Sequence, residues 1–292
     1  DKKTAKHLLS RTLMAGSKED IEFALSLSLD DFIQNHLLSV KPTPPPPGDW
    51  ADTIPLLLNG PHNEVYLEEL GCWYLELLHK HSYSFQERMV LFLHNHFTTT
   101  AAKAFQIQRI YQQSKLLRQY VFGNLKQLTK DITIDPAMLI FLDGAMNTKD
   151  RVNENYSREL LELFTLGLGN YTEQDIKQGP LALTGWTVPD NSLQSAFDAK
   201  HYYNNKVTYL GETGVFKYND IVDIIFEKPA AARFFCTKLC LEFVSPKPNQ
   251  AFIDELSQLF IDSGFEIREL LAHMFSSPHF YEEENFATKV RA

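Results

Sequence analysis

The sequence predicts a mostly α-helical protein, a multi-helix, bundle-like single domain with one short β-hairpin insertion. Apolar residues recur at helical spacing along most of the chain, as at Leu70, Trp73 and Leu77. Helix-start signals punctuate these stretches, such as Asp135 followed by Pro136. Only residues 193–216 carry a convincing strand pattern. At 292 residues, one such domain can bury about 75% of the surface that its unfolded chain would expose.

The N-terminal quarter suggests how the domain 1–292 is subdivided. Residues 1–41 contain three predicted helices, the second capped by Ser17 with Asp20 and the third by Asp30. We expect a helical subdomain over residues 1–41, a proline-rich connection over 42–50 and the main helical body over 51–292. The four prolines of the connection favour polyproline II geometry. A stiff surface connection is favoured there over a ligand for a proline-binding module.

Composition excludes several classes of protein. The net charge of −9 argues against nucleic acid as a main partner, because phosphate binding needs a basic surface. No apolar run reaches the roughly 18 residues that span a bilayer, so no transmembrane segment is expected. The first residues lack the apolar core of a signal peptide, and we expect any targeting segment to have been removed. Cys72, Cys236 and Cys240 give no disulfide framework.

Two histidines end a strongly apolar helix predicted over residues 85–97, which a Ser84–Glu87 capping box would begin. On a regular helix His94 and His96 lie about 200° apart, on nearly opposite faces. They could share a metal ion only where the helix end frays. The spacing therefore favours hydrogen-bonded structural histidines, with a divalent-metal site as the alternative.

A polar stripe follows one face of the helix predicted over residues 155–166. Asn155, Glu159 and Glu162 fall on this stripe, and Arg158 lies beside it with Glu154 four residues before. A solvated face with weak ion pairs is one interpretation. The other is a buried carboxylate pair that Arg158 neutralises and that faces histidines of the 85–97 helix. We expect Tyr156, Leu160, Leu163 and Phe164 to form the buried face.

The segment after this helix contains further turn signals. Gly167 and Gly169 allow a left-handed helix end, and Thr172 with Asp175 resembles a capping box for the next helix. Gly179-Pro180 is expected to interrupt that helix. The β-hairpin is expected near residues 196–211, with its turn at Asn204-Asn205.

Several strings of this sequence resemble the bacterial domain-of-unknown-function 1800 family. They are ERMVLFLHNHF, DPAMLIFLDGAMN, NENYSRELLELFTLGLGNYTEQDI, LTGW, ARFFCTKL and SPHF. The resemblance implies a helical bacterial protein in the periplasm, at the envelope or secreted, and a chain that continues beyond residue 292. It also implies a partner from a sulfatase-like family that is often encoded beside such proteins.

The same resemblance implies a set of polar site residues. They are His94, His96, Asp143, Asn147, Asn155, Arg158, Glu159, Glu162, Thr184, Trp186, His201 and Lys206. Two departures from the family pattern affect this set. Gly179-Pro180-Leu181 stands where relatives have small residues and an arginine, and Tyr202 stands where many relatives place an aspartate after the histidine.

Two functions remain open at the level of sequence. The first is an enzyme, hydrolase-type or metal-assisted, with Glu159, Glu162, Arg158, Asn155 and His201 in the catalytic site and His94 and His96 as metal ligands. HExxH, GxSxG and P-loop strings are absent. The second is a non-catalytic helical binding or assembly module whose polar cluster is structural. A small molecule or a polysaccharide is a possible ligand under either hypothesis.

Overall fold

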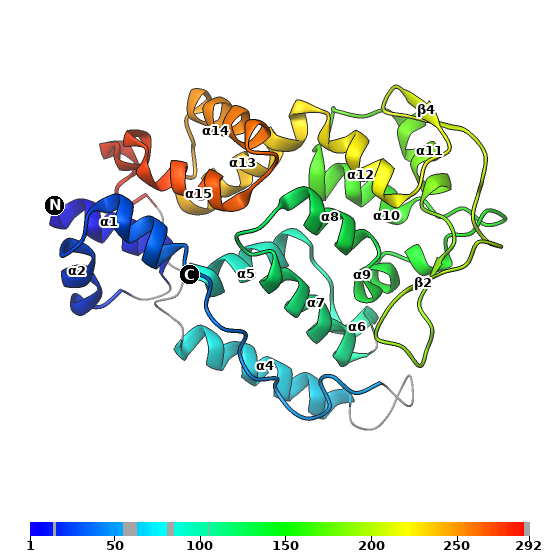
Figure 1. The fold of residues 1–292 in the computed structure, drawn as a ribbon, viewed down its shortest axis with the longest axis horizontal. Coiled ribbons are helices and arrows are strands. Elements are labelled where there is room, and N and C mark those ends of the chain that lie inside the picture. Colours follow the sequence, from blue (N-terminus) through cyan, green and yellow to red (C-terminus); the bar gives the residue numbers. More distant parts are fainter. Residues whose placement is uncertain (14–15, 55–62, 81–84, 105, 289–292) are drawn as a thin grey trace.

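A computed structural model describes residues 1–13, 16–54, 63–80, 85–104 and 106–288 (Figure 1). Ser84, the predicted cap of the 85–97 helix, lies outside these residues. Helices dominate the described chain, as predicted. Figure 1 places the first helices at one end of the molecule and the small strands at the other.

The N-terminal part is built from short helices. They are α1 (Lys2–Thr12), α2 (Lys18–Leu25), α3 (Leu29–Asp31) and the π-helical η1 (Phe32–Leu37). The Ser17–Asp20 capping box is present at the start of α2. The predicted cap at Asp30 is wrong, because Ser28 accepts the hydrogen bond from the Asp31 amide and Asp30 lies inside the helix. A side-chain oxygen caps a helix best from the residue just before its first turn.

The middle of the chain forms a second group of helices. They are α4 (Asn63–Lys80), α5 (Phe85–His96), α6 (Ala101–Ala104), α7 (Ile107–Gln119), α8 (Leu125–Thr133), α9 (Pro136–Phe141) and the 3-10 turn η2 (Gly144–Met146). Helix α5 ends at His96 as predicted. Buried Glu87 on α5 forms a 2.7 Å ion pair with buried Arg118 on α7, which ties these two helices together.

A π-helical turn interrupts the helix that carries the polar stripe. The α-helical part α10 (Asn155–Glu159) continues as the π-helical η3 (Leu160–Thr165). The amides of Leu166 and Gly167 both donate to the Leu161 carbonyl, at 2.8 and 3.0 Å. Because a π turn holds one more residue than an α turn, it rotates the side chains that follow. Leu163 is consequently 49% exposed, and its predicted burial is wrong.

The C-terminal half contains one α-helix before the small strands and four after them. It comprises α11 (Glu173–Ala182), α12 (Tyr218–Phe226), α13 (Pro229–Phe243), α14 (Gln250–Asp262), α15 (Ile267–Ser276), and the 3-10 turns η4 (Pro278–Tyr281) and η5 (Glu283–Asn285). The Thr172–Asp175 capping box begins α11 as predicted. The predicted interruption at Gly179-Pro180 is wrong, since α11 runs through both residues. Pro180 lies in the last turn, where its missing N–H removes only one helix hydrogen bond.

Two antiparallel strand pairs take the place of the single predicted pairing. Strand β1 (Trp186–Thr187) pairs with β2 (Ala196–Phe197), and β3 (Val207–Tyr209) pairs with β4 (Glu212–Gly214). The short hairpin is therefore present, but its predicted turn at Asn204-Asn205 is wrong. The chain turns at Leu210-Gly211, where both residues have positive φ, 48° and 93°. Two positive φ values in succession define the turn type that matches the twist of paired strands.

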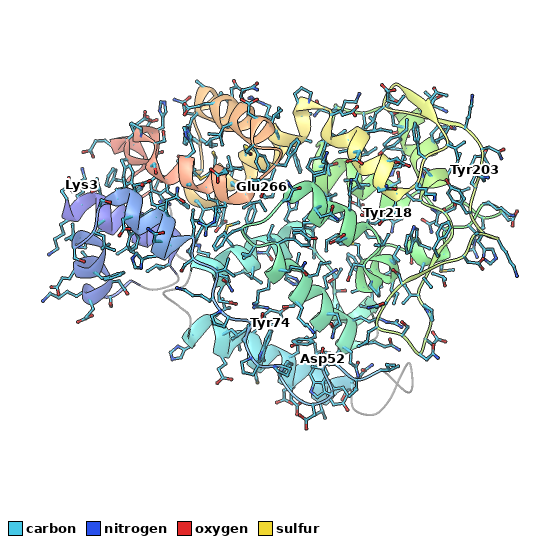
Figure 2. All side chains as sticks on the ribbon, in the orientation of Figure 1. Lys3, Asp52, Tyr74, Tyr203, Tyr218 and Glu266 are labelled. Atoms are coloured by element: carbon cyan, nitrogen blue, oxygen red, sulfur yellow. The ribbon has the colours of Figure 1, made fainter. Side chains whose placement is uncertain are left out.

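Side chains fill the spaces between the helices (Figure 2), and most of the buried ones are apolar. The main core runs from α1 to η4, so Leu8 and Ile33 of the N-terminal part share one cluster with Leu160 and Phe235. The division into a subdomain 1–41 and a main body stays a prediction. A smaller cluster forms where α4 packs on α7. There the Trp73 indole donates a 2.8 Å hydrogen bond to the Pro45 carbonyl, which holds the proline-rich connection against α4.

The first helix also contacts the last turns of the described chain. The buried His7 imidazole lies 3.0 Å from the Phe280 carbonyl through Nε2 and stacks on the Phe286 ring. Arg11 donates to the Asn285 carbonyl at 2.6 Å. In the described part of the chain, no helix combines the length and the apolar character needed to cross a membrane.

Candidate functional site around a π-helical turn

Two side chains from the resembling strings, Lys238 and His96, contact backbone carbonyls on the inner side of η3. The π geometry leaves the carbonyls of Leu163 and Phe164 at the end of the helix, where they need donors from elsewhere. Lys238 Nζ on α13 donates to the Leu163 carbonyl at 2.8 Å. His96 Nε2 at the end of α5 lies 2.9 Å from the Phe164 carbonyl. Three of the resembling strings therefore meet at this one turn.

The charge state of His96 follows from this arrangement. Burial and the neighbouring Lys238 lower the pKa of His96 to about 3, against a smaller opposing effect of the Phe164 carbonyl. The imidazole is consequently neutral near pH 7. A neutral ring that donates from Nε2 offers Nδ1 as an acceptor, and Lys238 Nζ lies 3.3 Å from Nδ1. Burial also lowers the pKa of Lys238. We call His96, Lys238 and the two carbonyls the inner clamp.

The outer side of the same turn carries the predicted carboxylates. Glu162 accepts a 3.0 Å hydrogen bond from the Tyr171 hydroxyl. Glu159 is half-buried and has no hydrogen bond or ion pair among the described residues. Burial raises the pKa of Glu159, and repulsion by Glu162 adds to the shift, while Arg158 opposes it. Arg158 itself pairs with Glu154 at 2.7 Å and with Glu173 at 3.9 Å rather than bridging the two stripe carboxylates.

Exposed apolar residues follow these carboxylates in the sequence. Leu163 is 49% exposed, and Leu168, just beyond the helix end at Gly167, is 76% exposed. The φ of Gly167 is +75°, and a Cβ there would lie 2.8 Å from the Phe234 ring, so the chain reverses where only glycine fits easily. We call Glu159, Glu162, Leu163 and Leu168 the π-turn face.

Asn155 begins the stripe beside a second polar group. Its amide nitrogen lies 3.3 Å from the Leu142 carbonyl and 3.5 Å from the Asp143 carboxylate. Lys103 on α6 forms a 3.2 Å ion pair with the same carboxylate. Asp143 adopts a left-handed backbone with φ of 60°, which allows the chain to turn from α9 into η2.

The remaining predicted histidines lie in other surroundings. His94 points from the opposite side of α5 toward Tyr74 on α4, with ring centroids 6.3 Å apart, and burial lowers its pKa. His201 is exposed, and its Nδ1 lies 3.0 Å from Asp198. The contacts of His94 and His96 are with these other groups, and the hypothesis that either histidine faces the stripe carboxylates stays a prediction. Within the described ranges, no three His, Cys, Asp or Glu side chains are grouped so that they could hold a metal ion.

The two departures from the family pattern, at Gly179-Pro180-Leu181 and at Tyr202, each have defined surroundings. Buried Asn147 donates to the Pro180 carbonyl at 2.7 Å. A Cβ at Gly179 would lie 2.4 Å from the Ser157 hydroxyl and 2.7 Å from the Tyr209 ring, so this position has no room for a side chain. At the second departure, the Tyr202 hydroxyl donates to the Phe216 carbonyl at 2.8 Å.

The last predicted site residues take structural positions around these departures. The buried Thr184 hydroxyl donates to the Leu181 carbonyl and accepts from the Tyr203 amide, both at 2.8 Å. The Trp186 ring lies edge-on to Tyr218 at 5.2 Å. Lys206 is exposed. Thr184 and Trp186 thus anchor the chain between α11 and the second strand pair.

Sequence reasoning did not single out Lys238 or Tyr171. Lys238 had one signal, because it is a cation among apolar residues in ARFFCTKL. Such a residue on a largely buried helix needs a partner. Tyr171 lies in a turn and carried no signal of its own.

Comparison with known proteins gives one result. No curated protein and no solved structure matched this chain. Residues 7–292 match the family described as "Protein of unknown function (DUF1800)". The match spans nearly the whole sequence, and the chain belongs to this family.

Proposed function

We propose that this chain is a non-catalytic helical binding module whose recognition surface is the π-turn face. The supporting observation is the contrast between the two sides of η3. The inner clamp fixes the backbone from behind, while two leucines of the most specific motif, Leu163 and Leu168, remain exposed beside two carboxylates. A surface held rigid before it meets a partner loses less conformational entropy on binding.

The positions of the polar motif residues also favour a binding module. His96 bonds a main-chain carbonyl, His94 lies on the α4 side of α5, and His201 pairs with Asp198 at the surface. Each has a partner that serves packing or local turn geometry. Buried polar groups that are fully hydrogen-bonded specify one arrangement of helices without taking part in a reaction.

The chemistry of the π-turn face defines the partner it suits. Apolar leucines beside Glu159 and Glu162 match a protein surface with an apolar centre and basic neighbours. We propose the sulfatase-like protein encoded beside such chains as that partner, with the complex in the periplasm, at the envelope or secreted.

The test uses this chain and that sulfatase-like protein, both purified, in a calorimetric titration. The double variant Leu163→Ser/Leu168→Ser should weaken binding at least tenfold, because truncating a central apolar anchor costs about 1–3 kcal/mol. Leu75→Ser is the matched control, since Leu75 on α4 is 68% exposed and lies outside the π-turn face. Equal weakening by the control, or no complex between the wild-type proteins, would contradict the proposal.

One observation favours a second candidate, acid–base hydrolysis of a polysaccharide. Glu159 has a raised pKa, while neighbouring Glu162 receives a hydrogen bond from Tyr171. Two carboxyl groups in unlike surroundings are how hydrolases separate the roles of acid and base. Reducing-sugar release from purified polysaccharides would test this candidate. The candidate requires that the wild-type protein releases reducing sugars. Glu159→Gln should abolish this activity without changing the circular dichroism spectrum, and Leu163→Ser should retain it.

A further inference from the structure

A cavity lies at the N-terminal end of the molecule, between α1, α2, η1 and the start of α5. Its volume is about 150 Å³, close to that at which an engineered apolar cavity binds benzene. Six apolar side chains line it: Leu9, Leu13, Phe23, Phe32, Leu37 and Phe85. Phe23 is 47% exposed, so the cavity opens to solvent beside its ring.

Among the described residues, three ionisable side chains also line the cavity, namely Asp20, His36 and Lys41. The Asp20 carboxylate accepts a 2.7 Å hydrogen bond from the Ser17 amide and sits in the first turn of α2, where the helix dipole favours a negative charge. His36 lies 3.9 Å from Asp31. Lys41 Nζ donates to the Ser39 hydroxyl at 2.8 Å and has no carboxylate within ion-pair distance among the described residues. Of the described side chains that line this cavity, Lys41 is the cation without a counter-ion.

We propose that this cavity binds a small anionic amphiphile, a linear alkyl carboxylate whose tail enters the cavity beside the Phe23 ring and whose carboxylate pairs with Lys41. The apolar lining favours a ligand with an apolar tail, and the unpaired Lys41 ammonium favours a negatively charged head group. This site is separate from the π-turn face, and its occupancy does not depend on the function proposed there.

Calorimetric titration of the full chain with hexanoate, octanoate and decanoate tests whether the alkyl tail is buried. Each ligand is kept below its critical micelle concentration. Affinity should rise about fourfold per methylene while the added carbon is still buried. Decanol and decylammonium test the head group. Decanoate should bind at least fivefold more tightly than decanol, and decylammonium should bind more weakly than both.

Variants locate the site. Phe23→Ser should weaken both decanoate and decanol, whereas Lys41→Met should weaken decanoate about fivefold and leave decanol unchanged. Lys200→Met, at an exposed lysine near the strands, and Leu75→Ser should change neither ligand. The proposal is overturned if decylammonium binds as tightly as decanoate or if Phe23→Ser has no effect. It is equally overturned if the chain binds phosphatidylglycerol vesicles but not monomeric decanoate, because the apolar surface would then face a membrane.

Discussion

The inner and outer sides of the π turn lie on one short stretch of helix, yet the polar groups on the two sides have opposite surroundings. On the inner side, the clamp uses a neutral histidine and a lysine to satisfy two main-chain carbonyls. On the outer side, Glu159 keeps a carboxyl group without a hydrogen bond among the described residues, and Glu162 relies on one tyrosine. The comparison indicates that the stabilising hydrogen bonds lie mainly on the inner side of the turn and that the outer side is available for recognition of a partner.

The largest expected effect is the response of the inner clamp to acid. The pKa of His96 is about 3 in the folded protein, below the 6.5 of an exposed histidine. The unfolded chain therefore binds the extra proton first, so the stabilisation is complete above pH 6.5 and is lost as the pH falls toward 3. Between pH 7 and pH 4 this residue alone should lower the free energy of unfolding by about 3 kcal/mol.

Urea unfolding at several pH values measures this loss, and His96→Leu is the control. Other groups titrate in the same range, so the difference between wild type and variant isolates His96. If the two proteins lose stability in parallel down to pH 4, the clamp does not depend on a neutral imidazole.

Removing the cation from the clamp should have the next largest effect. Lys238→Met keeps the length of the side chain but leaves the Leu163 carbonyl without its donor. Hydrogen bonds that involve a charged group contribute about 1.5–3 kcal/mol, and we expect a loss of about 2 kcal/mol in urea unfolding. The Gly167 amide donates a hydrogen bond within the π turn, and its hydrogen exchange should be faster in this variant than in the wild type. An unchanged exchange rate would show that the π turn does not need Lys238.

On the outer side, Tyr171→Phe should lower the free energy of unfolding by less than Lys238→Met does. It removes the 3.0 Å hydrogen bond to Glu162 from a partly exposed position, and water can replace the donor. We expect a loss of about 0.5–1 kcal/mol. A loss as large as that of Lys238→Met would remove the distinction between the two sides.

The smallest expected effect has the opposite sign. Because the pKa of Glu159 is raised in the folded protein, its contribution is most favourable at low pH and is lost as the pH rises through the folded pKa. Glu159→Gln should therefore slightly raise the melting temperature at pH 7 and have little effect at pH 3. A clear drop at pH 7 would mean that the carboxylate has a stabilising partner.

Local signals in the sequence predicted the features that local physics controls. The capping boxes at Ser17 and Thr172 form as expected, because a cap needs only the residues of one turn. The opposite orientations of His94 and His96 follow from helix geometry alone. The fold class followed from apolar spacing over many helices.

Features that depend on distant partners were not predictable in the same way. LLELFT has ordinary α-helical spacing, and the π turn gains its support from His96 and Lys238, which lie far away in the sequence. The exposure of Leu163 follows from that turn and was missed with it. The hairpin turn at Leu210-Gly211 was missed because a leucine with positive φ is uncommon and gives no signal.

The contacts of His7 and Arg11 with the last turns have a consequence for synthesis in the cell. The bond between His7 and Phe280 joins residues 273 positions apart. While the chain emerges from the ribosome, α1 must wait until Phe280 has been made before its buried histidine finds its carbonyl. Until then, the apolar face of α1 lacks part of its covering. We expect this first helix to be the segment that a chaperone protects longest and that a protease removes most easily from an incomplete chain.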